Sequence, residues 1–321
     1  GIDNDYRKFF FGRDASTKRI KQFLKTEYKK NYIHFDSNIS KIREIEKIFK
    51  KYKNKIKLVI HSAAQPSHDW AASNPELDFD VNAIGTLNML KLTKKYLQKK
   101  TPFIYMYTNK VYGDNPNKLK ILEKRTRYEL SKKNKFYNGV NEKLSVDDCT
   151  HSFFGVSKIY ADLIVQEYGR NVGLKTVCFR AGCITGPNHS GAKLHGFLSY
   201  LVKQSLLKKE YTILGYKGKQ VRDNLHSFDL INCFWEYFKK PKKGMVYNIG
   251  GGRFSNCSIL EAISEIEYIA KIKIKRKFIK QNRIGDHIWY ITDNKKFKKD
   301  YPNWKQKYNT KKIIKELILN L

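Results

Sequence analysis

The segment KLVIHSAAQ, residues 57–65, decides the fold because a short apolar run passes directly into small and polar residues. An apolar run of about four to eight residues that ends at a turn is typical of a strand buried in a parallel sheet. Similar runs are FIYMYT at 103–108, TVCFRA at 176–181 and MVYNIG at 245–250. Between the runs, residues 75–97 and 154–169 carry apolar side chains at helical spacing. This alternation predicts an α/β fold with a doubly wound parallel sheet and helices on both of its faces.

The length and the cysteine pattern limit the class of protein. The chain has 321 residues, which is enough for one large α/β domain with a substrate lobe or for two domains. Its five cysteines form no C-x-x-C pair and no metal-site spacing, so we expect reduced thiols, a cytoplasmic location and no metal. No apolar run approaches the roughly 18 residues that a membrane span needs, and we expect no membrane partner.

The net charge of +34 raises the question of a nucleic-acid partner. The excess is nearly all lysine and is spread over the whole chain. A protein that reads phosphates or bases favours arginine, whose planar fork binds them through two hydrogen bonds. We therefore interpret the charge as a solvated, lysine-rich surface and rank specific nucleic-acid binding as the third choice of function.

Polar and glycine-containing segments follow the predicted strands. They are GIDND at 1–5, HSAAQPSHDW at 61–70, TNKVYGD at 108–114 and AGCITGPNHSG at 181–191. In open α/β sheets, ligands bind at the carboxyl ends of the strands. The sequence therefore predicts that the functional side chains lie in these four segments.

These four segments and five further ones together resemble the extended short-chain dehydrogenases/reductases. Within that group they resemble the NAD-dependent epimerase/dehydratase family of nucleotide-sugar enzymes. The five are VNAIGTLNML (81–90), HSFFGVSK (151–158), GYKGKQVRDNLHS (215–227), YNIGGGRFSN (247–256) and QNRIGDHIWYITD (281–293). The resemblance covers nearly the whole chain. It implies a Rossmann-type NAD-binding domain over residues 1–180, with later returns to the sheet. A smaller lobe over residues 181–321 would mainly bind the nucleotide sugar.

The resemblance also implies an assembly and a setting. In the family, the helices that correspond to residues 75–97 and 154–169 pack into a four-helix interface, so we expect a homodimer. The expected setting is the supply of sugars for surface polysaccharide.

The cofactor side of the site follows from the same resemblance. Asp3 takes the place of the acid that binds the ribose diol, and its charge favours NAD over NADP. Ala63, Ala64 and Gln65 occupy the stretch where the backbone passes close to the cofactor. Asn82 is the residue that braces the strand ends near the active site.

The start of the sequence carries an expectation of its own. The family's Gly-rich phosphate-binding loop precedes the ribose-binding acid, whereas this chain begins at Gly1, inside an expected strand. We therefore expect a fragment that lacks the first strand and the loop, and that binds NAD poorly.

The resemblance assigns the catalytic roles to Thr108 and Lys158. Thr108 would hydrogen-bond the sugar hydroxyl that is oxidised, and Lys158 would contact the nicotinamide ribose. Dehydratases of the family carry an Asp-Glu pair after this Thr, whereas this chain has Asn109 and Lys110, which disfavours dehydration. Asn109 is also expected to contact the substrate. The expected function is an NAD-dependent epimerase of a nucleotide sugar, with carbon 2 of a CDP-sugar as the inverted centre.

The remaining substrate contacts are expected in the second half of the chain. Arg222 and Arg283 lie in KQVRDN and NRIGDH, where the family grips the substrate diphosphate and where a bidentate arginine binds better than a lysine. Asn188 and His189 in GPNHSG are expected to line the sugar-nucleotide pocket, although His189 fits a plain loop residue equally well.

Phe154 departs from the family pattern, because the residue four before the catalytic Lys is a Tyr that handles the substrate proton. Three interpretations follow. Tyr112, Cys183 or His189 takes the proton; or a solvent relay through Thr108 and Lys158 supports a slow reaction; or the protein binds NAD and a nucleotide sugar without catalysis. A reductase or 4-epimerase acting on another nucleotide sugar is the alternative enzyme.

Overall fold

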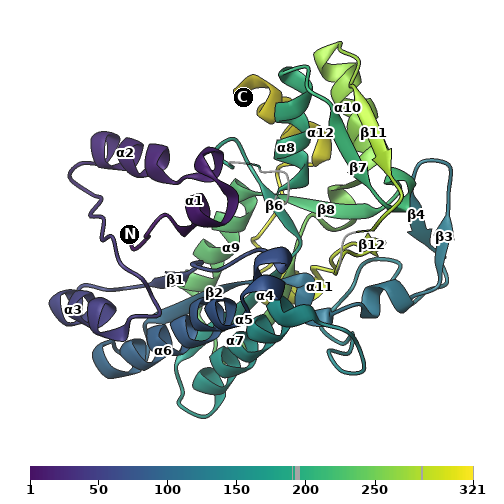
Figure 1. Ribbon diagram of the computed structural model, residues 1–321. Helices are drawn as coiled ribbons and strands as arrows, with labels where there is room; N and C mark the ends of the chain where they lie inside the picture. The colour runs from purple at the N-terminus through teal and green to yellow at the C-terminus, as the bar shows by residue number, and fades with distance from the viewer. Residues whose placement is uncertain (190, 192–195, 283–284, 321) are drawn as a thin grey trace. The chain divides into compact units, whose positions relative to one another are not determined.

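The computed structural model describes residues 1–189, 191, 196–282 and 285–320, and these residues form two compact units (Figure 1). Unit 1 consists of residues 1–107, 153–178 and 240–246. Unit 2 consists of residues 108–152, 179–239 and 247–321. Both units are built from discontinuous segments.

The main sheet has the parallel, Rossmann-type character that the sequence predicts. Among the described residues, its strands are ordered β1-β2-β5-β9, with bounds Val59–His61, Pro102–Thr108, Lys175–Ala181 and Met245–Ile249. β1 and β2 are parallel, and Val59 lies opposite Phe103. All four strands were predicted from apolar runs, so the α/β fold class is confirmed.

The helices of unit 1 surround the segments that carry its predicted site residues. They are α1 (Tyr6–Phe11), η1 (Arg13–Ala15), α2 (Lys18–Glu27), α3 (Ile42–Tyr52), α4 (His68–Ser73), α5 (Pro75–Phe79), η2 (Asp80–Ile84), α6 (Gly85–Tyr96) and α7 (Ser152–Arg170). The predicted helix over residues 75–97 is therefore present as α5, η2 and α6. It begins where Asn74 caps Leu77 N and Pro75 takes the first helical position. Its middle part, η2, is a π-helical turn, a distortion that is frequent at functional sites.

The N-terminal segment differs from the strand expected there. Ile2 forms one isolated parallel bridge with Phe35, and Asp3 N donates to Phe35 O at 3.2 Å. The extended segment ends at once because Asp5 has a left-handed backbone with φ 57°. The carboxylates of Asp3 and Asp5 then accept hydrogen bonds from nearby donors of the same segment.

Unit 2 is built on β8 (Val221–His226). β8 pairs with β6 (Cys183–Thr185) and β12 (Trp289–Tyr290) in parallel and with β10 (Asn256–Ser258) antiparallel. The parallel pair β7 (Tyr211–Leu214) and β11 (Arg276–Ile279) packs with α8 (Phe197–Leu206), α10 (Ile259–Ala270) and α12 (Thr310–Asn320) around a core that includes Leu201, Ile213, Ile266 and Ile313 (Figure 1). The other elements are η3 (Asn109–Tyr112), η4 (Asn115–Lys118), β3 (Ile121–Glu123), β4 (Tyr128–Leu130), η5 (Tyr216–Gly218), α9 (Ser227–Lys239), η6 (Gly252–Phe254) and α11 (Lys295–Asp300).

Gly169, near the end of α7, tests how tightly unit 1 is packed. A Cβ atom there would overlap the backbone of Gly244 and the hydroxyl of Thr176. We expect Gly169→Ala to lower the free energy of unfolding by about 3 kcal/mol, because backbone atoms cannot move aside as a side-chain end can. Urea denaturation measures this change.

Gly173 provides the matched control for this substitution. It has φ +83°, and a Cβ atom there would have Lys243 Nζ, at 3.8 Å, as its nearest neighbour. Gly173→Ala should therefore cost only about 1 kcal/mol, from the left-handed backbone. Equal costs at the two glycines would contradict the close approach of α7 to Gly244.

Candidate active site

In unit 1, Asn82 binds the loop after β1 to helix α7. Its Oδ1 accepts from Gln65 N at 3.0 Å, and its Nδ2 is 3.1 Å from Gln65 O. The same Nδ2 lies 2.9 Å from Asp78 Oδ1 and 3.2 Å from Ser157 Oγ. Asn82 is 1% exposed, and a buried amide is stabilising only when its donors and acceptors are satisfied, as they are here. The structure thus gives Asn82 a bracing contact between two segments that carry predicted site residues.

The loop held by Asn82 contains the three residues predicted to face the cofactor. Gln65 is buried, and its Nε2 donates to Ser67 O at 2.8 Å and to Asp78 Oδ1 at 2.6 Å. Ala63 and Ala64 are half-buried and directly precede it. A small side chain at these positions leaves the backbone open to close approach by a ligand.

Lys158 is the buried cation of unit 1. It is 4% exposed, and its Nζ lies 5.9 Å from the ring centroids of both Tyr105 and Phe154. Burial lowers the pKa of Lys158 to about 8, although the carboxylate of Asp78 opposes this shift. A cation held at this cost is typical of a functional position, since a structural role rarely requires it.

Phe154 lies one helical turn before Lys158 on α7 and is 5% exposed. Its ring contacts the imidazole of His68, the first residue of α4, with 4.6 Å between the ring centroids. The position that the family pattern gives to a Tyr hydroxyl is therefore bordered by one ammonium group and one imidazole.

Asp3 is an exposed carboxylate at the N-terminal bridge of unit 1. Its Oδ1 accepts from Asp5 N at 2.8 Å and from Thr17 Oγ1 at 2.9 Å. These contacts fix the orientation of the carboxylate, which remains exposed to solvent.

Thr108 ends β2 and opens unit 2. Its hydroxyl accepts from Lys110 N at 3.3 Å and points to Asn109 Oδ1 at 3.4 Å. The second distance is long for a hydrogen bond between two oxygens, so the hydroxyl can exchange this partner readily. Asn109 is buried, and Thr108 is half-buried.

Arg222 on β8 forms the charged centre of unit 2. Its guanidinium donates to the carboxylate of Asp286 and, through Nη1, to Val221 O at 2.7 Å. Lys110 Nζ donates to Gly285 O at 2.6 Å. Burial alone would raise the pKa of Asp286, but the charges of Arg222 and Lys110 outweigh it and hold that pKa at about 2.

Two of the three candidate proton acceptors are poorly suited to the role. The Tyr112 hydroxyl donates to Asn248 Oδ1 at 2.7 Å and accepts from Arg180 Nη1 at 3.1 Å, and burial raises its pKa to about 12. Burial also raises the pKa of Cys183 to about 11, despite the charge of Arg222. Neither group is therefore poised to exchange a proton near neutral pH.

The remaining predicted substrate contacts lie in or beside loops. His189 is half-buried, with its Nδ1 3.4 Å from Thr185 Oγ1, and Asn188 is exposed. Arg283 lies outside the described residues.

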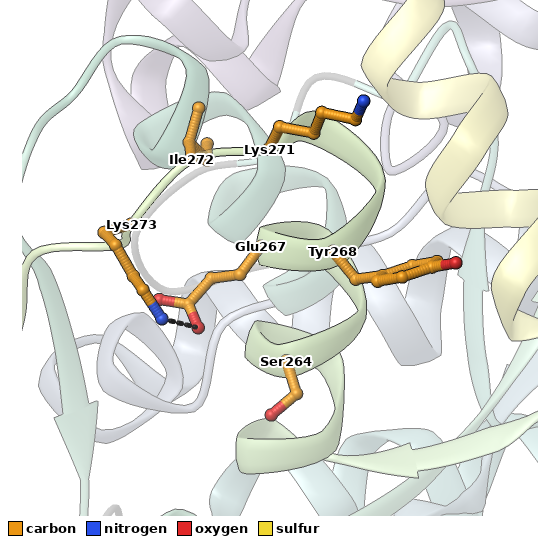
Figure 2. A pocket seen from close by; sticks show the side chains of 6 residues that line it. All are labelled: Ser264, Glu267, Tyr268, Lys271, Ile272 and Lys273. Atoms are coloured by element: carbon orange, nitrogen blue, oxygen red, sulfur yellow. Dashed lines mark ion pairs between the residues drawn. The ribbon is translucent and has the colours of Figure 1, made fainter.

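A separate pocket of unit 2 lies at the end of α10 (Figure 2). It is lined by Ser264, Glu267, Tyr268, Lys271, Ile272 and Lys273. Its ion pair, Lys273 Nζ to Glu267 Oε2 at 3.8 Å, involves a lysine side chain that is 93% exposed. An exposed pair of this kind binds little, and none of the predicted site residues lines the pocket. We assign it no role.

The described residues contain neither a metal-binding cluster nor a membrane-spanning helix. Within the described ranges, no group of three or more His, Cys, Asp and Glu side chains could hold a metal ion. No helix in the described part of the chain has the length and apolar character needed to cross a membrane.

Comparison with known proteins places these features in a family. Residues 4–250 match the NAD dependent epimerase/dehydratase family. The chain belongs to this family. It is also 31% identical over 264 residues to CDP-paratose 2-epimerase of Salmonella typhi, a match that covers 80% of this chain and 75% of that protein. The resemblance on which the sequence prediction rests is therefore confirmed.

Solved structures of other proteins share the fold of this chain. UDP-glucuronic acid 4-epimerase of Bacillus cereus, in complex with UDP-glucuronic acid and NAD, has a TM-score of 0.76 at 22% identity. That match covers 100% of this chain and 89% of the other. A Tyr-to-Phe variant of the same enzyme, in complex with UDP-4-deoxy-4-fluoro-glucuronic acid and NAD, matches with the same TM-score, identity and coverage.

The family is NAD-dependent, in agreement with the predicted cofactor, and the residues of unit 1 suit a dinucleotide. An exposed carboxylate, Asp3, can accept hydrogen bonds from ribose hydroxyls. The small residues Ala63 and Ala64 leave room for close approach, and the buried Lys158 can donate to a polar group.

Three residues that contact the predicted site residues in unit 1 were not found from the sequence. Asp78 and Ser157 complete the contacts of Asn82, and His68 contacts Phe154. Two of the three stand in segments that the sequence analysis singles out: His68 in HSAAQPSHDW, which follows β1, and Ser157 in HSFFGVSK. Asp286 similarly lies in a segment singled out for Arg283 alone.

The burial of Lys158 should be measurable as a stability cost. A pKa lowered from 10.5 to about 8 corresponds to about 3 kcal/mol against the charged form. We expect Lys158→Met to raise the free energy of unfolding by about this amount at pH 7.

The stability difference between the wild type and Lys158→Met should depend on pH. Below pH 8 both folded and unfolded wild-type chains carry the charge, so the full cost is present. Between about pH 8 and 10.5 the unfolded chain binds more protons, and the wild type gains stability as the pH rises. Urea denaturation at pH 7 and pH 10 should show the gap between wild type and Lys158→Met closing. Lys94→Met, at an exposed position of α6, is the control, and a constant gap at Lys158 would contradict the shift.

Proposed function

We propose that the protein is an NAD-dependent nucleotide-sugar epimerase that inverts carbon 2 of a CDP-sugar by transient oxidation of a sugar hydroxyl. The observation that carries the proposal is the buried Lys158, held on α7 beside the Asn82-braced loop of a chain that belongs to an NAD-dependent family. The identity to CDP-paratose 2-epimerase supports the choice of substrate. Asn109 and Lys110, in place of an acidic pair, support epimerisation over dehydration.

In this proposal, NAD is held by residues of unit 1. Asp3 binds the ribose diol, Ala63, Ala64 and Gln65 line the dinucleotide, and Lys158 binds the nicotinamide ribose. When bound, NAD supplies the oxidising power by accepting a hydride from the sugar and returning it. Asn82 keeps the loop and α7 in register during these steps.

The chain's own groups orient the sugar and stabilise charge. Thr108 exchanges its weak contact with Asn109 for a hydrogen bond to the hydroxyl being oxidised. Lys158, charged below its pKa of about 8, stabilises negative charge that develops on that oxygen. The partly buried surroundings make this charge more effective than it would be in water.

The substrate diphosphate is assigned to Arg222, assisted by Arg283, and the sugar nucleotide to Asn109, Asn188 and His189. Arg222 binds the carboxylate of Asp286, which shows that its guanidinium suits an oxyanion, and a diphosphate would join or displace that carboxylate. The proposal also includes the division of the chain into a cofactor domain over residues 1–180 and a substrate lobe over residues 181–321. It further includes a homodimer, a cytoplasmic location and a role in supplying sugars for surface polysaccharide.

A second candidate is a protein that binds NAD and a nucleotide sugar without turnover. Phe154 favours it, since a phenyl ring cannot exchange a proton. The Tyr-to-Phe variant of UDP-glucuronic acid 4-epimerase was obtained with both ligands bound, so such a substitution is compatible with binding in that enzyme. A 4-epimerase or reductase of another nucleotide sugar is the enzyme alternative.

Turnover of CDP-paratose separates these functions. We expect the protein, expressed with any residues encoded ahead of Gly1 and supplied with NAD, to convert CDP-paratose into its 2-epimer, followed by NMR. Binding of both ligands without conversion, together with conversion by Phe154→Tyr, would identify a silent site. Conversion of UDP-sugars but not of CDP-paratose would reject the substrate assignment.

The role of Arg222 predicts a binding defect. We expect Arg222→Lys to raise KM for the nucleotide sugar by about 10- to 100-fold with a smaller change in kcat, because a lysine cannot form the two parallel hydrogen bonds. Arg125→Lys, at an exposed position of the same unit, is the control and should leave KM unchanged. An effect on kcat alone would reject the assignment to the diphosphate.

A further inference from the structure

We propose that His68 carries the substrate proton in place of the hydroxyl group that Phe154 lacks. This inference rests on the proposed function, because it concerns the oxidation and reduction of a sugar hydroxyl. Its basis is the direct contact between the imidazole of His68 and the ring of Phe154, with 4.6 Å between centroids and 56° between planes.

The two rings differ in their access to solvent. Phe154 is 5% exposed, whereas His68, whose ring contacts it, is half-buried. A half-buried imidazole can both touch a ligand and pass a proton to solvent. The ring of Phe154 supplies only packing.

The position of His68 is fixed by the same hydrogen bonds that fix α7. His68 follows Ser67, whose carbonyl accepts from Gln65 Nε2 at 2.8 Å. Gln65 is bound by Asn82, and Asn82 donates to Ser157, the residue before Lys158. The backbone before His68 is therefore held relative to α7 by a short series of buried contacts, and the imidazole itself packs on the ring of Phe154, so the position suits a proton-transfer group.

Other titratable groups near Lys158 in unit 1 are less suitable. Tyr105 is 1% exposed, and burial raises its pKa well above the ordinary value. His61 is 2% exposed, its Nε2 lies 2.9 Å from Thr86 Oγ1, and burial lowers its pKa to about 3. Lys158 is itself 4% exposed. Lys158 is assigned to stabilise charge on the sugar oxygen, and of the other three groups His68 is the most exposed.

The proton balance is simple. As the carbon–hydrogen bond breaks and its hydride passes to NAD, the oxygen–hydrogen bond also breaks and the carbon–oxygen double bond forms. The released proton adds to a neutral ring nitrogen of His68. When the ketone is reduced from its other face, the imidazolium returns the proton to the oxygen, so His68 ends the cycle neutral. Imidazole is the side chain best matched to such an exchange near neutral pH.

A rescue experiment tests the assignment. We expect His68→Asn to lower kcat for CDP-paratose by about 100-fold or more, the usual contribution of a general acid–base group. Phe154→Tyr restores a phenol next to Lys158, so the double variant should turn over within about threefold of Phe154→Tyr alone. Asp69→Asn, at the next and exposed position of α4, controls for disturbance of the helix and should retain wild-type kcat.

Each contrary result has a distinct meaning. His68→Asn with wild-type kcat, or a double variant as inactive as His68→Asn, overturns the role of His68. A wild type that is inactive while Phe154→Tyr turns over also overturns it and leaves the substrate assignment intact. If no form converts CDP-paratose, the proposed function fails and this inference fails with it. Thermal denaturation identifies a misfolded His68→Asn, in which case His68→Gln takes its place.

Discussion

The side-chain amide of Asn82 is the constraint on which the site in unit 1 depends. One buried group bonds both backbone atoms of Gln65 and reaches α7 at Ser157, far away in the sequence. Without it, the loop after β1 would keep its bond from the Gln65 side chain to Asp78 but would lose both bonds at the Gln65 backbone and the bond from Asn82 to α7. A backbone that is no longer fixed can shift enough to spoil the alignment of a reacting group. A fully hydrogen-bonded amide is satisfied in one arrangement of its neighbours, so Asn82 fixes the position of the loop relative to α7 in addition to stabilising it.

Burial of charge is the second theme of the molecule. In unit 1 an ammonium is kept in an apolar setting between aromatic rings, and in unit 2 a carboxylate is kept ionised by two cations. The first arrangement favours loss of a proton from Lys158, and the second favours retention of charge on Asp286. Removal of water disfavours the charged form of both groups; the cations beside Asp286 outweigh this effect, whereas the carboxylate of Asp78 does not outweigh it at Lys158.

Much of the fold could be predicted from the sequence because its signals are local. The runs that form β1, β2, β5 and β9 are apolar in themselves, and the helices at residues 75–97 and 152–170 show their own periodicity. The strand expected at Gly1, with Asp3 at its end, is reduced to one parallel bridge at Ile2, and the left-handed backbone of Asp5 that follows it is a local feature that composition does not reveal. Short strands such as β11, whose residues Arg276–Ile279 are all exposed, have no apolar pattern to detect.

The site was less predictable because its contacts join distant segments. Asn82 was identified through the family resemblance, but its partners Asp78 and Ser157 look like ordinary polar residues of helices. His68 and Phe154 are likewise separated by 86 positions in the sequence, and neither segment carries a pattern that predicts their contact. Pairings of this kind arise only when the chain has folded. The roles of Thr108, Lys158, Asp3 and Arg222 remain predictions, with their surroundings now described.

The π-helical turn at Asp80–Ile84 has a consequence for how this site can vary. A π turn holds one residue more than the α-helix on either side, so it changes the phase between α5 and α6. Loss of a single residue from the turn would restore a regular helix and rotate one flank by about 100° relative to the other. Asp78 on α5, which bonds Gln65, and Asn88 on α6, which bonds Ile39 O and Ser40 O, would then lose their present orientation relative to each other. Single-residue insertions and deletions are tolerated in most surface loops, but here one would change the phase of the helix and separate these two sets of contacts.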